Sequence, residues 1–247
     1  FEAVAAEAPR LLAVMKAQGL SNTAWAYATA GVSAPALFQA ISAESQRKIG
    51  RFDSQALATT LWAFSTAGVE APALFEAVAA ASAKKITMFT PQALAKTARA
   101  FATAGFAAPA LFGAIATESS RRILRFDPPA LADTAWAFVT AGVAAPALFE
   151  VMAVKMEENM AAFNEDDLAQ LHRVSAQLRL EAPQNPLTLL LIRHEASLEA
   201  VFHRRAPTMS LAQRQVSKAL SSIGWAHEHV TCHGGIRLDM AQPASKV

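Results

Sequence analysis

Cysteine is almost missing from this chain, because Cys232 is the only one in 247 residues. A single thiol excludes an intrachain disulfide framework and suits a reducing compartment. No nucleophile–base pair, glycine-rich phosphate loop or paired-carboxylate motif stands out in the sequence. Charge-free runs such as residues 134–149 contain Gly142 and Pro146, so we interpret them as buried helix pairs. We therefore expect no membrane span, no cofactor and no metal ion.

Charge is scarce, and it is unevenly distributed. Only 17% of the residues are charged, and the formal net charge is +2. Residues 1–171 hold 13 Lys and Arg against 15 Asp and Glu, whereas residues 172–247 hold 9 against 5 together with all six His. The first part of the chain is therefore near neutral and the last part is basic.

A repeat of 37 residues organises the chain. Glycine, proline, phenylalanine and threonine each recur at this spacing four times, at Gly31, Gly68, Gly105 and Gly142; Pro35, Pro72, Pro109 and Pro146; Phe38, Phe75, Phe112 and Phe149; and Thr23, Thr60, Thr97 and Thr134. A fixed period of this length is typical of stacked repeat arrays. We count four full units from residue 20 to 163 and a degenerate fifth that begins at Asn164.

Each unit is predicted to be two helices. Asp53, Thr90 and Asp127 are suitable N-caps for the first helix, and the glycine of each unit suits its C-terminal end. The proline of each unit begins the second helix. Such a pair cannot bury both faces alone, so the units stack into a continuous core. Trp25, Trp62 and Trp136 recur in register, and we interpret them as packing residues.

The fold class that follows is all-α, a right-handed α-solenoid over residues 1–180. Residues 181–208 are predicted to be a linker with one connecting helix over 187–205. A different module begins at residue 209, where a helix, a strand, a turn at Gly234–Gly235 and a second strand are expected. Because Phe1 lies 37 residues before Phe38, we expect the sequence to be a fragment.

One exposed position of the first helix varies while its neighbours repeat. It lies about 200° around the helix from Leu57, and its occupants are Asn22, Thr59, Lys96, Asp133 and Gln170. Side chains offered once per unit can read one RNA base each. The alternative is that the residue at this exposed helix position varies because it has no function.

A pair of basic residues recurs near the end of each second helix. The pairs are Arg47 with Lys48, Lys84 with Lys85, and Arg121 with Arg122. A stripe of cations at equal spacing could contact a phosphate backbone. Alternatively, the pairs only compensate helix dipoles and keep the protein in solution.

Four potential metal ligands crowd one short segment, at His227, His229, Cys232 and His233. Their spacing matches no closed zinc pattern, so ordinary strand residues are the favoured interpretation.

Residues 210–247 resemble the opening of a RAP domain. The matching features are the helix of Gln213, Val216 and Leu220, then Ile223–Gly224–Trp225, His227–Glu228, and residues 238–241 before Pro243. The upstream units resemble octotricopeptide-type repeats and those of FAST-kinase-like proteins, which share the pattern xQxLAxTxWAFxTAG. The resemblance implies a restriction-endonuclease-like α/β domain, truncated here, with Asp239 as the one weak catalytic candidate present.

The same resemblance implies an organellar protein, in the mitochondrial matrix or chloroplast stroma, that binds single-stranded RNA. Its role would lie in RNA processing, stability or translation, in company with other RNA-processing proteins and in ribonucleoprotein granules. A protein-interaction scaffold without nucleic-acid binding is the alternative, and an RNA-cleaving enzyme is a third. We expect no nuclease activity from this chain.

Overall fold

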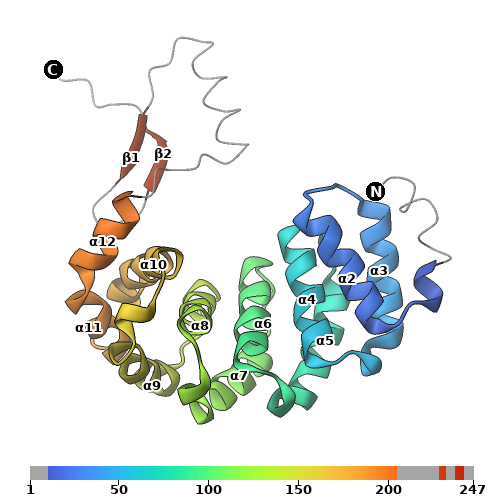
Figure 1. Cartoon of the computed structure of the whole chain (residues 1–247), viewed down its shortest axis with the longest axis horizontal. Coiled ribbons are helices and arrows are strands. Elements are labelled where there is room, and N and C mark those ends of the chain that lie inside the picture. The colour runs from blue at the N-terminus through green and yellow to red at the C-terminus, as the bar shows by residue number, and fades with distance from the viewer. Residues whose placement is uncertain (1–10, 205–227, 232–236, 242–247) are drawn as a thin grey trace.

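A computed structural model describes residues 11–204, 228–231 and 237–241. Paired helices follow a curved path from α2 to α11, with the first helix of each unit on the inner side and the second on the outer side (Figure 1). The all-α repeat architecture expected from the 37-residue period is therefore confirmed.

The helix boundaries repeat closely from unit to unit. The first helices are α2 (Ala17–Thr29), α4 (Ser54–Thr66), α6 (Pro91–Thr103), α8 (Pro128–Thr140) and α10 (Glu165–Glu181). The second helices are α3 (Pro35–Lys48), α5 (Pro72–Lys85), α7 (Pro109–Arg121) and α9 (Pro146–Glu157). Short 3₁₀ turns follow the second helices, at η1 (Ile49–Arg51), η2 (Ile86–Met88), η3 (Ile123–Arg125) and η4 (Met160–Ala162).

The predicted N-caps are confirmed at the first helices. The side chains of Asp53, Thr90 and Asp127 each accept a hydrogen bond from the backbone N–H three residues later. Asn164 forms a full capping box with Asp167 at the start of α10. The first helix α2 differs, because Lys16 stands at this position and an ammonium group cannot accept.

The first helix of each of the four full units ends at a glycine in the left-handed region. Gly31, Gly68, Gly105 and Gly142 have φ values from 62° to 64°. A Cβ at Gly105 would meet no atom within 4 Å, so alanine there is disfavoured by backbone conformation alone. The turn between the two helices of a unit depends on this backbone state.

We expect Gly105→Ala to lower the free energy of unfolding by about 1–2 kcal/mol, the usual cost of a left-handed L-residue. Urea denaturation followed by circular dichroism measures this loss. The matched control is Gly113→Ala within α7, where an added Cβ also meets open space. Alanine there should stabilise the fold by about 0.5–1 kcal/mol because it lies inside a helix. The same shift at both glycines would contradict the backbone argument.

Aromatic pairs join each unit to the next. Phe38 of α3 contacts Phe64 of α4 edge to face, with ring centroids 5.0 Å apart. Phe75 and Phe101 repeat this contact at 5.3 Å, and Phe112 and Phe138 repeat it at 5.0 Å. All six rings are buried, so the interface between units is a phenylalanine core surrounded by alanine and leucine.

The end of the array differs from the single helix expected over residues 187–205. Two helices are present, α11 (Pro186–Arg193) and α12 (Glu195–Arg204), and a turn at His194 separates them. Asn185 caps α11 through the Leu187 N–H at 2.9 Å. Helix α11 packs against α9 and α10, so it takes the place of a second helix in the fifth unit. Helix α12 packs against α10.

The two strands expected near the C-terminus are present as β1 (Glu228–Thr231) and β2 (Arg237–Ala241). They pair antiparallel, with Val230 opposite Leu238 and an irregularity in register between Glu228 and Val230. Among the described residues, none of the helices is long and apolar enough to cross a membrane.

Candidate nucleic-acid interface

The inner surface of the array is formed by one face of each first helix. Helix α4 is flanked by α2 and α6 and backed by α5, which leaves a single face uncovered. Gln55, Thr59, Trp62 and Thr66 share that face because they are spaced i, i+4, i+7 and i+11, and all four are half-buried or exposed. We call the equivalent faces of α2, α4, α6, α8 and α10 the inner stripe.

The predicted base-reading residues all lie on the inner stripe, and the first three remain accessible. Asn22 and Lys96 are exposed and make no side-chain hydrogen bond or ion pair within the described part of the chain. Thr59 is half-buried, and its hydroxyl accepts from the Gln55 amide at 3.3 Å. These three units therefore present polar groups to the inner surface.

The remaining two candidates contact each other through a residue from a third unit. Nη1 of Arg99 donates to the carboxylate of Asp133 and, at 2.6 Å, to Oε1 of Gln170. Gln170 in turn donates to Asp133 over 3.2 Å. The network joins α6, α8 and α10, and we call it the Arg99 clamp. Asp133 and Gln170 are thus held in place by the protein itself.

Arg99 was not predicted to be a structural residue, although the sequence contains a signal for it. Arg99 stands where the other units have tryptophan, at Trp25, Trp62 and Trp136. Its guanidinium carbon lies 4.9 Å from the centroid of the Trp136 ring, a cation–π contact. Arginine replaces the repeated tryptophan in one unit, and the next unit has an acidic residue at the variable position. Together these two departures indicate an ion pair between the units.

The tryptophans are less buried than packing residues would be. Trp62 and Trp136 pack against the core but stay partly exposed, and Trp25 is 48% exposed. The interpretation of Trp25 as a packing residue is therefore wrong. Its ring stands on the inner stripe at the N-terminal end of the array.

Helix α12 packs against α10 at the C-terminal end of the array. The Phe202 ring stacks on His172 with centroids 4.5 Å apart, and the Arg173 guanidinium lies 5.9 Å from the same ring. Arg173 occupies the tryptophan position of the fifth unit. Arg173 itself stays exposed, so α10 keeps this part of the inner stripe at the surface.

The first member of each predicted phosphate-binding pair is exposed. Arg47 and Arg121 are paired with a glutamate one turn earlier on their own helix, Glu44 at 2.5 Å and Glu118 at 2.6 Å. Hydrogen bonds from Arg47 and then Lys48 lower the pKa of Glu44 from its usual 4.5 to about 2. Lys84 is exposed as well and makes no ion pair within the described residues.

The second member of each pair points back into the fold. Lys48 is buried and donates to the carbonyl oxygens of Leu12, Ala13 and Met15, at 3.3, 2.7 and 2.8 Å. Lys85 does the same one unit later, with the carbonyls of Gly50 and Phe52 at 3.0 and 2.9 Å.

Arg122 occupies the corresponding position in the third unit. Its side chain is 13% exposed, and its Nε lies 2.6 Å from Oε1 of Glu118. In all three pairs, therefore, one cation faces solvent and the other is occupied within the protein.

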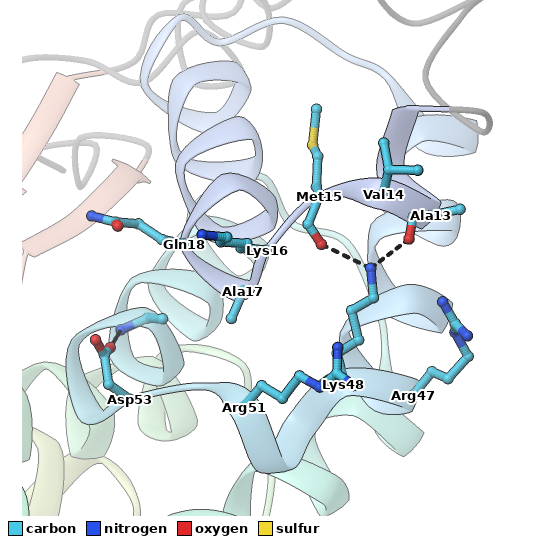
Figure 2. A pocket seen from close by; sticks show the side chains of 11 residues that line it. Ala13, Val14, Met15, Lys16, Ala17, Gln18, Arg47, Lys48, Arg51 and Asp53 are labelled. Atoms are coloured by element: carbon cyan, nitrogen blue, oxygen red, sulfur yellow. Dashed lines mark hydrogen bonds between the residues drawn. The ribbon is translucent and has the colours of Figure 1, made fainter.

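A cavity of about 520 Å³ opens beside the first of these pairs. Lys16, Arg47, Lys48, Arg51 and Asp53 line it, and Figure 2 shows the Lys48 ammonium turned toward the Ala13 and Met15 carbonyls. Asp53 is occupied as the cap of α4. The exposed head groups of Lys16, Arg47 and Arg51 make this end of the array locally basic.

Asp239 lies on β2, while His227, Cys232 and His233 fall outside the described residues. The RAP-like resemblance over residues 210–247 also lies mostly outside them.

One family model matches the chain. It is described as RNA-editing substrate-binding complex 6 protein, and the match covers residues 2–183. These residues include every unit of the array as far as the end of α10. No curated protein matches the chain.

Proposed function

Because the chain belongs to the RNA-editing substrate-binding complex 6 protein family, we propose that it is an RNA-binding component of an organellar RNA-processing assembly. The array holds single-stranded RNA along its inner surface, and other proteins of the assembly act on that RNA. The mitochondrial matrix is the compartment that suits an RNA-editing role.

One observation carries the proposal. The inner stripe offers one variable polar side chain per unit, and Asn22 and Lys96 are exposed with no internal partner within the described residues. An amide can pair with a base edge, and an ammonium group can contact a base or a phosphate. Asp133 and Gln170 are engaged in the Arg99 clamp, so base contacts fall to the units whose polar groups are open.

The phosphate backbone would be held by exposed cations at the unit ends. Arg47, Lys84 and Arg121 recur at 37-residue intervals and face solvent. Cations that neutralise phosphates give a binding constant that falls with salt concentration. Lys48, Lys85 and Arg122 are left out of this role because their head groups are engaged within the fold.

The C-terminal segment is proposed to be the start of a RAP domain. The antiparallel pair of β1 and β2 is compatible with an α/β domain of this kind. Asp239 stays a weak catalytic candidate, and the proposed role needs no cleavage by this chain.

The proposal is tested by selecting bound RNAs from a randomised single-stranded pool at two salt concentrations. We expect Asn22→Ala or Lys96→Ala to alter base preference at one position of the selected sequences. Lys84→Ala should weaken all sequences alike and reduce the salt slope by about 1. A chain that retains no RNA even at low salt would contradict the proposed function.

A protein-interaction scaffold is the second candidate. Its support is the near-neutral array together with apolar side chains that stand exposed at Met88, Leu124, Val154 and Leu180. A stoichiometric partner that survives ribonuclease treatment, with no RNA binding by the isolated chain, would favour it.

A further inference from the structure

We propose that the Trp25 and Trp62 rings are stacking platforms for RNA bases, and that the Arg99 clamp ends the base-binding part of the inner surface. The site would then span α2, α4 and the start of the clamp on α6. This inference rests on the proposed function, since it specifies where the RNA lies and which side chains bind it.

The two rings occupy equivalent positions on the inner stripe. Trp25 and Trp62 lie in the same register of consecutive first helices, three residues after the variable positions Asn22 and Thr59. On a helix this spacing places both side chains on one face, one turn apart. Each unit thus pairs a flat aromatic surface with a polar group that can reach a base edge.

Both rings are at least partly accessible to solvent. Trp25 is 48% exposed. Trp62 is half-buried, because part of its ring packs against the core. A large aromatic ring left in water is costly, whereas a base that stacks on it removes apolar area from water. Because every base has a π face, such stacking tolerates any sequence. Specificity would then come from the polar partner of each ring.

The Arg99 clamp marks the proposed end of the base-binding part of the inner stripe. Trp136 occupies the same register in the fourth unit, but the Arg99 guanidinium already lies over its ring. Asp133 and Gln170 hold that guanidinium in place, and the fifth-unit Arg173 lies against Phe202 of α12. The Trp136 ring therefore already has a cation of the protein over it, whereas Trp25 and Trp62 have no ring or cation partner among the described residues.

Charge supports the same placement. Lys96 on the inner stripe and Arg51 beside the basic cavity are both exposed. Lys16 is exposed at the start of α2, the helix that carries Trp25. An RNA strand that stacks on the two rings would have cations in the same or the next unit to neutralise its phosphates.

The test uses the full chain and oligouridines of increasing length, followed by fluorescence anisotropy. We expect Trp25→Leu and Trp62→Leu each to weaken binding about tenfold, because stacking on an aromatic ring contributes on that scale. Trp25→Phe and Trp62→Phe keep a flat ring and should retain most of the affinity. With one base per unit, affinity should level off at about three to four nucleotides.

Trp136→Leu is the matched control, since it makes the same change in the same register beyond the boundary and should leave affinity unchanged. An abasic oligonucleotide of the same length should bind as weakly to the native chain as to Trp25→Leu. Urea midpoints of all variants show whether a loss of binding is only a loss of fold.

The outcomes separate the inference from the proposed function. Unchanged affinity in both leucine variants, with RNA still bound, would overturn the stacking platforms alone. Equal loss in the Trp136 variant would overturn the boundary. Absence of binding by the native chain would overturn both, and leucine variants that lose a protein partner but keep RNA would assign the rings to that partner.

Discussion

Phe101→Ala is expected to lower the free energy of unfolding by about 3–5 kcal/mol, the usual range for deleting a buried phenylalanine ring. Phe101 lies in α6 and is fully buried. Its ring contacts Phe75 of the preceding unit edge to face, with centroids 5.3 Å apart, and Phe106 at 5.9 Å. Alanine would leave a cavity at the interface between two units in the middle of the array.

The location of the cavity determines how the variant unfolds. Stability in a repeat array is close to a sum of unit terms and nearest-neighbour interfaces. A weakened central interface should let the two halves unfold separately, so urea denaturation by circular dichroism should show a broader or two-step transition. The control Phe101→Leu retains most of the volume and should cost less than about 1.5 kcal/mol. A loss below about 1 kcal/mol in the alanine variant would contradict this view of the core.

Lys48→Met is expected to lower the free energy of unfolding by about 2–4 kcal/mol, because hydrogen bonds to charged groups contribute more than neutral ones. The substitution keeps an unbranched side chain, shorter by one atom, but removes the ammonium group. Three carbonyl oxygens, of Leu12, Ala13 and Met15, would lose their donor in a buried place. Glu44 would also lose a partner at 2.5 Å.

Local exchange of backbone amides identifies this effect, since protection should fall first where residues 11–20 pack on α3. Lys84→Met is the control, because this exposed lysine should change stability by less than about 0.5 kcal/mol. Lys85→Met should fall between the two, as Lys85 donates to two carbonyls rather than three. Equal losses at Lys84 and Lys48 would show that the buried contacts contribute nothing.

The basic pairs illustrate what a sequence pattern leaves open. Lys84 and Lys85 are the same residue type at neighbouring positions, and both were predicted to contact phosphate. Successive residues on a helix point about 100° apart. One therefore faces solvent, while the other reaches the carbonyls of the preceding unit, and only the stacking of units determines which carbonyls are near.

The inner stripe shows the same division. Its position on the first helix followed from the distance to Leu57 in the helical period, and the structure bears out that position. The engagement of Asp133 and Gln170 could not be predicted, because their partner Arg99 lies 34 and 71 residues away in sequence. Contacts over such separations depend on how closely and at what angle successive units stack.

The sequence by itself determined much of the local structure of this protein: the 37-residue unit, the side-chain caps of the first helices from α4 onward, the glycine ends of the first helices in the four full units, and the two strands near the C-terminus. These features arise from interactions among residues a few positions apart, so the chain pattern contains them in full. Tertiary structure alone decided which cations and polar groups stay available to a ligand. Availability is set by contacts between units, where a buried ammonium or guanidinium must find oxygen partners that no local pattern specifies.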